Sequence, residues 1–278
     1  MDHAAKIWME WTRQHEILVT NLQKIREGHH GEAIHDFRVA VKKTRAYLKL
    51  LVHILHKSRN DLKIPSTESL FDALGKLRDV EIAVELFNTI GDSEKINTRP
   101  FRKYLDRVKL QVLYWVTEAL KNYDDTELKN VSNALGLLLK ETGDEKLGAS
   151  MRSAFVKDYE RIGHLSHQPS SKTHEVRKLL KNWYYWLDLA PAGLLAIDAT
   201  KNKPIKSALE RLGNWQDHDM LRLKIRHFRK DFVPATNPQY AALRELEKHL
   251  KIKMEEFLKK IKPGLEWFRD GKAFAGAN

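Results

Sequence analysis

Residues 33–48 read AIHDFRVAVKKTRAYL, and residues 172–187 read KTHEVRKLLKNWYYWL. At an offset of 139 positions, half of the 278-residue length, the two segments share a histidine, an acid, an arginine, a lysine and a leucine. A second pair, LGKLRDVEI at 74–82 and LGNWQDHDM at 212–220, follows in the same order. Two ordered matches indicate an internal duplication, with one repeat over residues 1–139 and the other over 140–278.

Hydrophobic residues recur with helical periodicity through both halves, and Gly, Pro, Asn and Asp cluster where the pattern breaks. The pattern predicts helices near residues 4–27, 32–57, 67–90, 98–123, 127–141, 148–164, 172–189, 203–230 and 237–262. Prolines such as Pro204 are expected at helix ends, where a missing N–H costs least. No strand is predicted. Four helices per half, with a shorter one between the halves, predict an all-α fold of two antiparallel four-helix bundles in tandem.

The composition is that of a soluble, ordered chain, with 42% hydrophobic and 31% charged residues and only 13 Gly and 8 Pro. The absence of cysteine excludes disulfides, thiolate metal sites and a cysteine nucleophile. No apolar run is long enough to span a membrane, and the first residues do not form a signal peptide. We therefore expect a cytoplasmic protein without a membrane partner. The net charge of +12 favours a polyanionic partner.

One basic ridge stands out in the first repeat. On a helix, five cationic or titratable residues fall within an arc of about 80° that covers about 21 Å of the helix axis: His35, Arg38, Lys42, Arg45 and Lys49. Apolar residues fall on the opposite side and predict the buried face: Phe37, Val41, Leu48, Leu51 and Leu55. The cations recur every three or four residues, as a linear polyanion would require.

The ridge differs from an ordinary solvated helix face because it contains no acids. From Phe37 to Asn60 the sequence has seven basic residues and no Asp or Glu. Such unrelieved repulsion destabilises a helix, and a bound anion would relieve it. The pattern returns in the second repeat with His174, Arg177 and Lys181, and Lys178 lies close beside them.

The two segments and the LGKLRD and LGNWQDHD motifs that follow them resemble the duplicated signature of the CHAD (conserved histidine α-helical domain) family over nearly the whole chain. The resemblance implies a single domain over residues 1–278, built as two four-helix bundles related by pseudo-two-fold symmetry. It also implies a binding module for inorganic polyphosphate, with histidines and basic side chains around a central groove. Localisation to polyphosphate granules would follow from such binding.

The family pattern H-x-x-R-x-x-x-K/R-x-x-R falls without a gap on His35, Arg38, Lys42 and Arg45. In the second repeat it falls on His174, Arg177 and Lys181, but Tyr184 replaces the last arginine. Gln216 likewise replaces the arginine that the first repeat has as Arg78. These departures remove expected cations from the second repeat, and Lys178 partly compensates.

Two acids lie inside the otherwise basic motifs, Asp79 in the first repeat and Asp217 in the second. We expect them to orient arginine or histidine side chains rather than to bind the polyanion. The proposed polyphosphate ligands are the ridge residues of both repeats: His35, Arg38, Lys42, Arg45, Lys49, His174, Arg177, Lys178 and Lys181. No cofactor, metal or catalytic residue is predicted, so the protein is expected to bind polyphosphate without processing it.

The main alternative is nucleic-acid binding, because a pI near 9.6 and basic helices suit DNA or RNA equally well. Recognition of single strands uses exposed aromatic side chains, whereas apolar periodicity places the tryptophans in the core: Trp8, Trp11, Trp115, Trp183 and Trp267. An HD-type phosphohydrolase is weakly suggested by His35-Asp36 and by residues 217–219, and histidine pairs at 53/56 and 164/167 have metal-compatible spacing. Neither histidine pair has a nearby acid that would complete a metal site.

Overall fold

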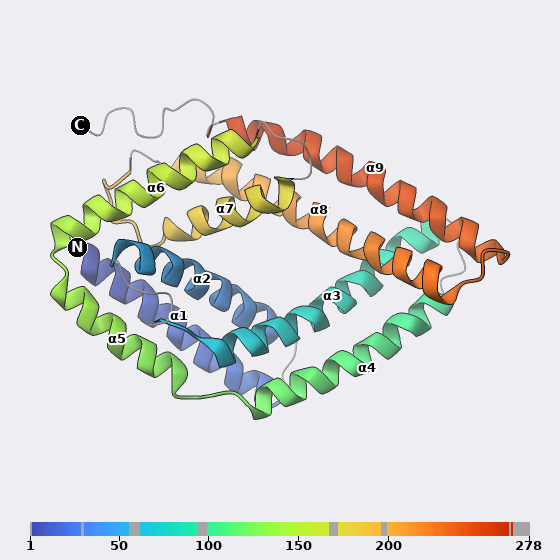
Figure 1. Ribbon diagram of the computed structural model, residues 1–278, viewed down its shortest axis with the longest axis horizontal. Coiled ribbons are helices and arrows are strands. Elements are labelled where there is room, and N and C mark those ends of the chain that lie inside the picture. Colours follow the sequence, from blue (N-terminus) through green and yellow to red (C-terminus); the bar gives the residue numbers. More distant parts are fainter. Residues whose placement is uncertain are drawn as a thin grey trace. The chain divides into compact units, whose positions relative to one another are not determined.

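The computed structural model of the protein describes residues 2–28, 31–55, 62–93, 99–166, 172–195, 199–266 and 268. Within these residues the helices are α1 (His3–Arg26), α2 (Glu32–Ile54), α3 (Pro65–Ser93), α4 (Arg99–Lys121), α5 (Glu127–Glu141), α6 (Asp144–Ser166), α7 (Thr173–Trp186), α8 (Ala199–Phe232) and α9 (Pro238–Glu266) (Figure 1). No strand occurs in these ranges. The all-α prediction is therefore confirmed, and each predicted helix has its counterpart.

One difference in helix bounds, at the start of α8, changes where a predicted helix-end residue lies. This helix begins at Ala199 instead of near residue 203, so Pro204 lies inside its second turn and not at its end. The prediction for Pro204 was wrong because a proline early in a helix loses only one backbone hydrogen bond, a cost that packing later in the helix offsets. The other helix ends agree to within a few residues.

The chain divides into two compact units that each draw on both halves of the sequence. Unit 1 comprises residues 1–71, 119–206 and 263–278, and unit 2 comprises residues 72–118 and 207–262. Unit 1 thus contains α1 and α2 from the first half together with α6 and α7 from the second. The tandem-bundle arrangement and the repeat boundary at residue 139 stay predictions from the sequence.

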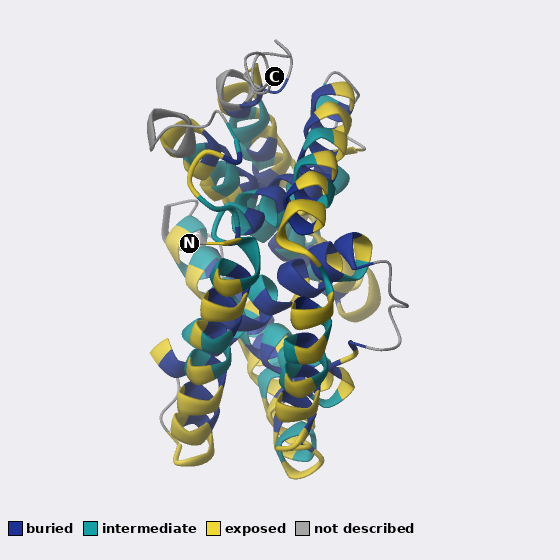
Figure 2. Ribbon diagram, turned by 90° about the vertical axis from the view of Figure 1, so that its left-hand side faces the viewer, coloured by how far each residue is buried: buried dark blue, intermediate teal, exposed yellow. Residues whose placement is uncertain are grey.

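Helix α2 is central to unit 1, where it packs against α1, α6 and α7 (Figure 1). Its apolar face is buried as predicted: Phe37, Val41, Leu48, Leu51 and Leu55 are at most 8% exposed. Figure 2 shows this division along the helices, with buried residues on the faces that meet other helices and exposed residues on the opposite faces. The basic ridge of α2 is consequently left at the edge of the core.

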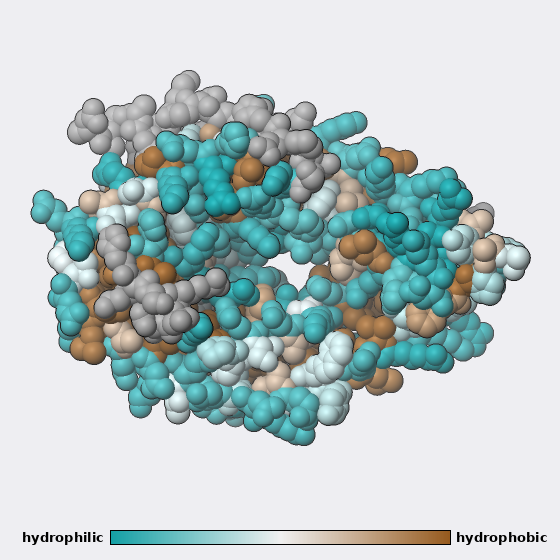
Figure 3. All heavy atoms as spheres, viewed as in Figure 1, coloured by the Kyte–Doolittle hydropathy of each residue, from teal (hydrophilic) through white to brown (hydrophobic). Residues whose placement is uncertain are grey.

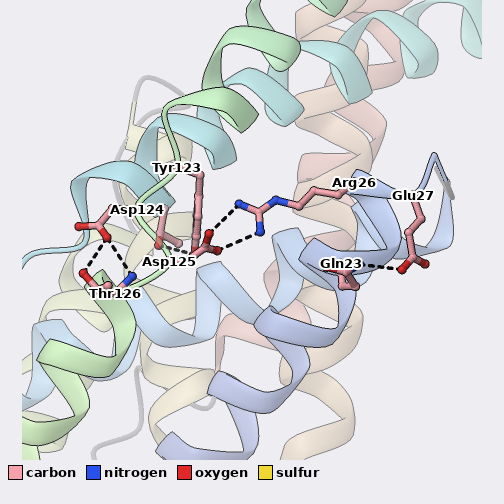
Figure 4. Close-up of polar contacts among 8 residues, drawn as sticks. Gln23, Arg26, Glu27, Tyr123, Asp124, Asp125 and Thr126 are labelled. Atoms are coloured by element: carbon pink, nitrogen blue, oxygen red, sulfur yellow. Dashed lines mark hydrogen bonds and ion pairs between the residues drawn. The ribbon is translucent and has the colours of Figure 1, made fainter.

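The turn between α4 and α5 is held by a compact set of polar contacts (Figure 4). Arg26, at the end of α1, donates two hydrogen bonds to the carboxylate of Asp125, at 3.0 and 3.1 Å. Asp124 accepts hydrogen bonds from the backbone N–H and the hydroxyl of Thr126, and these bonds lower the pKa of Asp124. The turn places the buried Glu127 at the start of α5.

Glu127 caps the first turn of α3, whose initial N–H groups have no partner within the helix. Its carboxylate accepts hydrogen bonds from the backbone N–H groups of Ser66 and Thr67, at 2.7 and 3.0 Å, and from both hydroxyls. The negative charge is also favourable at the positive end of the helix dipole. One side chain therefore fixes where α3 begins.

Unit 2 is built around aromatic side chains from α3, α4 and α8. The rings of Phe87 and Phe101 are 4.5 Å apart, and Phe101 also packs against Phe228 at 5.2 Å. Arg229 is buried next to this cluster, where it donates a hydrogen bond to Glu247 and lies 4.5 Å from the ring of Tyr240. The partner carboxylate raises the pKa of Arg229, so this buried charge is compensated.

The tryptophans divide between core and surface. Trp11 and Trp183 are buried as predicted, but Trp8 and Trp115 are 42% and 39% exposed, so the core prediction was wrong for both; Trp267 lies outside the described residues. Trp8 lies beside Gly136 of α5, at a distance where a Cβ on residue 136 would be in ordinary van der Waals contact with the ring. Periodicity predicts which face of a helix is buried. It does not predict how much of a large aromatic ring at the edge of that face is covered by neighbouring residues.

On the face drawn in Figure 3, hydrophilic residues make up most of the coloured area and hydrophobic patches are small. Among the described residues, no helix combines the length and apolar character needed to cross a membrane.

Replacing Glu127 by alanine leaves the buried N–H groups at the start of α3 without their acceptor. We expect Glu127→Ala to lower the free energy of unfolding by about 2–3 kcal/mol. Urea unfolding followed by circular dichroism measures the loss. Glu141→Ala removes an exposed acid from α5, the helix that begins with Glu127. Its free energy of unfolding should stay within about 0.5 kcal/mol of the wild-type value. Equal losses in the two variants would contradict the capping role.

Candidate anion-binding site

The nine predicted ligands lie on two helices that pack against each other in unit 1. His35, Arg38, Lys42, Arg45 and Lys49 lie on α2, and His174, Arg177, Lys178 and Lys181 lie on α7. These are the helices that the sequence repeat relates. The packing of α7 on α2 therefore brings the basic residues of both repeats into one region.

Specific contacts hold the C-terminal end of α7 to α2 despite the like charges. The indole N–H of Trp186 donates a hydrogen bond to the carbonyl of Ala46 at 2.7 Å. Just after α7, Asp188 accepts hydrogen bonds from the Lys43 ammonium at 2.7 Å and the Tyr47 hydroxyl at 2.9 Å. Burial and the Asp188 charge raise the pKa of Tyr47, which stays a hydrogen-bond donor at neutral pH.

A cavity of about 830 Å³ lies between the two helices and the segment that leads into α3. Seven basic side chains and one acid line it: Lys42, Arg45, Lys49, Lys63, Arg177, Lys178, Lys181 and Glu68. We call this cavity the basic pocket; all of its residues belong to unit 1. Six of the nine predicted ligands line it. His35, Arg38 and His174, nearer the N-terminal ends of the two helices, are not in its lining.

Arg38 has a structural contact that the sequence did not indicate. Its guanidinium donates a hydrogen bond to the carbonyl of Phe71 at 2.9 Å and lies 4.7 Å from the centre of the Phe71 ring. His35 and His174 are exposed. If these three residues contact a polyanion, they do so beyond the lining of the pocket.

Acids from other helices partner several cations of α2. Glu68 on α3 lies 3.4 Å from Arg45, and Asp158 on α6 lies 3.8 Å from Lys49. Burial raises the pKa of Asp158, although the Lys49 charge opposes this shift. The inference that repulsion on α2 is unrelieved therefore holds only in part, because the sequence could not show acids that approach from α3 and α6.

The pKa of Lys181 is strongly perturbed. Burial contributes most, and together with the charges of Lys42, Arg177 and Arg38 it lowers the pKa of this ammonium group to about 6. The Lys181 ammonium is also 5.6 Å from the centre of the Tyr185 ring.

Lys42 contributes to the lowered pKa of Lys181, second only to burial. The neutral form of the Lys181 amine is therefore favoured while no ligand is bound. An anion entering the pocket would allow both groups to be charged.

The pocket includes residues that the sequence analysis did not select. Lys63 lies in the short segment before α3, outside the repeated motifs. Tyr185 also lines the pocket, and burial raises its pKa to about 12. Its neighbour Tyr184, which replaces the expected arginine, is half-buried with its ring 6.2 Å from that of Tyr185.

The two motif acids lie in unit 2. Asp79 is an exposed residue of α3 that raises the pKa of Lys224 against the effect of burial, and Asp217 is a half-buried residue of α8. Their expected role in orienting basic side chains stays a prediction.

The described residues contain no group of three or more side chains suited to hold a metal ion. In both metal-compatible histidine pairs, His53/His56 and His164/His167, the second histidine lies outside the described residues. The histidine of the 217–219 motif, His218, forms a hydrogen bond with the carbonyl of Asn214 at 2.8 Å. Neighbouring Asp219 is paired with Arg222 on the same helix.

Comparison with known proteins identifies a family. The model of the CHAD domain family matches residues 11–226. Among solved structures, the fold is similar to the crystal structure of the CHAD domain from the plant Ricinus communis, with a TM-score of 0.68, 16% sequence identity and coverage of 96% of this chain and 92% of that one. A search of curated proteins gives no match.

Lys181 gives the ligand-free protein a measurable pH dependence. Because the pKa is lower in the folded state than in the unfolded one, the unfolded state binds the extra proton between about pH 6 and 10, and stability rises with pH there. We expect Lys181→Met to be more stable than the wild type at pH 7. The advantage should shrink by about 1.4 kcal/mol per pH unit as the pH rises.

Denaturant unfolding at several pH values measures this difference. Lys129→Met, which removes an exposed lysine of α5, serves as the control. Parallel stability curves for the wild type and Lys181→Met would contradict the assignment of the neutral amine to Lys181.

Proposed function

Since the chain belongs to the CHAD domain family, we propose that it is a non-catalytic binding protein for inorganic polyphosphate and that the basic pocket holds part of the phosphate chain. The proposal extends to the cytoplasm as the site of action and to localisation at polyphosphate granules. No metal or cofactor is required for this binding.

The charge of the pocket supports a ligand with many negative charges. Seven basic side chains face one acid, and that acid already lies beside Arg45. Arginines can bind two phosphate oxygens at once, while lysines adapt as mobile point charges. A phosphate chain carries about one negative charge per phosphate, so it can contact α2 and α7 simultaneously.

Lys181 is the observation that carries the proposal. A protein that only needed a solvated basic surface would have no reason to bury one lysine beside Lys42 and Arg177. Binding of a polyanion would replace the repulsion among these groups by attraction. A bound ligand would thus reduce the electrostatic cost of assembling the cluster.

The residues outside the pocket suit the extension of a long chain. His35 and Arg38 precede Lys42 on the same ridge of α2, and His174 precedes Arg177 on α7. A polyphosphate longer than the pocket would follow either ridge towards the N-terminal end of its helix. Short chains would be confined to the pocket lining.

A competition experiment tests the choice of ligand. Labelled long-chain polyphosphate is bound at physiological salt and challenged with pyrophosphate, single-stranded RNA and duplex DNA at matched phosphate concentration. Displacement by unlabelled polyphosphate alone is the expected result. If RNA or DNA displaces the label equally well, the net charge acts unspecifically and nucleic-acid binding becomes the better hypothesis.

Removing single cations from the pocket tests its location. Arg45→Met on α2 and Lys178→Met on α7 should each weaken polyphosphate binding about tenfold, the effect of losing one charge-assisted contact. Lys129→Met removes the same charge from the exposed surface of α5 and should change affinity by less than about twofold. Fluorescence anisotropy measures the three affinities. Equal effects in all three variants would place binding outside the pocket.

Binding should also depend on pH through Lys181. A bound polyanion raises the pKa of this group from about 6, so binding takes up a proton at neutral pH. Affinity should therefore rise as the pH falls from about 8.5 to 6 and level off below that. Calorimetry in buffers with different ionisation enthalpies counts the protons. Proton uptake that persists unchanged in Lys181→Met would assign the effect to the histidines instead.

A further inference from the structure

The side chain of Phe71 contacts two arginines of the basic ridge. Phe71 lies in the second turn of α3, and the guanidinium groups of Arg38 and Arg45 both lie over its ring, 4.7 and 5.3 Å from the ring centre. The backbone carbonyl of Phe71 also accepts a hydrogen bond from Arg38 at 2.9 Å. All three residues belong to unit 1. One residue of α3 therefore contacts two cations that lie two turns apart on α2.

Contact with an aromatic ring holds an arginine without using its hydrogen-bond donors. The face of the ring attracts a cation, so the ring offsets part of the repulsion between two guanidinium groups that lie close together. The N–H donors of a guanidinium group lie in its own plane, so an arginine stacked on a ring keeps its edge available. Phosphate groups bind at that edge through two parallel hydrogen bonds.

A carboxylate of α3 lies at the edge of Arg45. Glu68, one turn before Phe71, approaches the Nε atom of Arg45 to 3.4 Å. The two side chains of this ion pair are 43% and 42% exposed, so the pair is weak and open to competition by a stronger anion. A phosphate group that displaced Glu68 would find the guanidinium of Arg45 already in place over the ring.

The start of α3 is fixed independently of the arginines. Glu127 accepts hydrogen bonds from the backbone N–H groups of Ser66 and Thr67, which defines the first turn of the helix. Phe71 follows in the next turn, so its ring has a fixed origin. An arginine held against such a ring loses less side-chain entropy on binding a ligand than one that moves freely.

We propose that Phe71 is a positioning residue for the anion, which holds Arg38 and Arg45 ready to bind two parts of one phosphate chain. Arg45 lines the basic pocket and Arg38 lies outside its lining. Phe71 thereby joins the pocket to the ridge that leads towards the N-terminal end of α2. This inference rests on the proposed binding of polyphosphate.

Replacement of the ring tests this role. Phe71→Leu removes the aromatic face but keeps the backbone carbonyl that Arg38 contacts. We expect it to weaken the binding of long-chain polyphosphate about fivefold, the effect of losing two exposed cation–π contacts. Phe71→Tyr keeps an aromatic face and should bind within about twofold of the wild type. Fluorescence anisotropy measures the affinities, and equal losses in the two variants would count against the role of the ring.

A double-mutant cycle separates positioning from a loss of local packing. In a protein that already carries Arg38→Met and Arg45→Met, the ring has no guanidinium group to hold, so adding Phe71→Leu should change affinity by less than about twofold. A purely structural effect of Phe71→Leu would persist in that background. Phe232→Leu is the matched control, because it replaces an exposed phenylalanine of unit 2, and it should leave affinity unchanged.

The contacts of the ring can also be followed without a phosphate ligand. Phenylglyoxal modifies guanidinium groups, and peptide mass spectrometry gives the rate at each arginine. In Phe71→Leu, Arg38 and Arg45 should be modified about threefold faster than in the wild type, because the ring no longer holds them. Arg161, an exposed arginine of α6 that is paired with Glu175, should keep its rate. Unchanged rates at Arg38 and Arg45 would overturn the inference.

The results distinguish the inference from the proposed function. If the wild type binds polyphosphate and Phe71→Leu binds it equally well, the inference fails while the proposed function stands. If the wild type does not bind polyphosphate, the proposed function fails and the role of Phe71 in binding a phosphate chain fails with it. Faster modification of Arg38 and Arg45 in Phe71→Leu would then still show that the ring holds both arginines.

Discussion

The packing of α7 against α2 is the constraint on which the site depends. Both helices carry basic residues on the side that lines the pocket, so bringing them together is electrostatically unfavourable. The apolar faces of the two helices supply the opposing free energy, since Phe37, Leu51 and Trp183 are fully buried. The Trp186 hydrogen bond to Ala46 and the contacts of Asp188 then fix one position of α7.

This packing sorts the cations by their surroundings. Arg45 and Lys49 lie towards the C-terminal end of α2, where acids of α3 and α6 approach them. Lys181 lies among Lys42, Arg177 and Arg38, whose charges add to the effect of burial in lowering its pKa. The Arg45–Glu68 pair is a surface ion pair, which contributes little to stability, whereas Lys49 lies beside the buried Asp158. The second group is where a ligand can change the free energy most.

The sequence predicted the helices and the basic ridges because both follow from local periodicity. The buried positions of α2 are three or four residues apart, so the opposite face could be identified as well. Contacts between distant segments could not be predicted in this way. Glu68 and Asp158 reach α2 from other helices, and Lys63 enters the pocket from a segment without a repeated motif.

The packing of two helices with similar basic motifs explains how many cations come to line one pocket. One basic helix in isolation would distribute its cations along a solvated face, where water and salt screen them. When the repeat-related helix packs against it, the cations of both copies share one cavity with restricted solvent, and each charge acts on the others at lower effective dielectric. The same step lowers the pKa of the most buried amine, because proton release is the one response available without an anion. The positive potential of the pocket and the lowered pKa of Lys181 therefore have a common origin in the α2–α7 contact, and a substitution that separates the two helices should weaken both together.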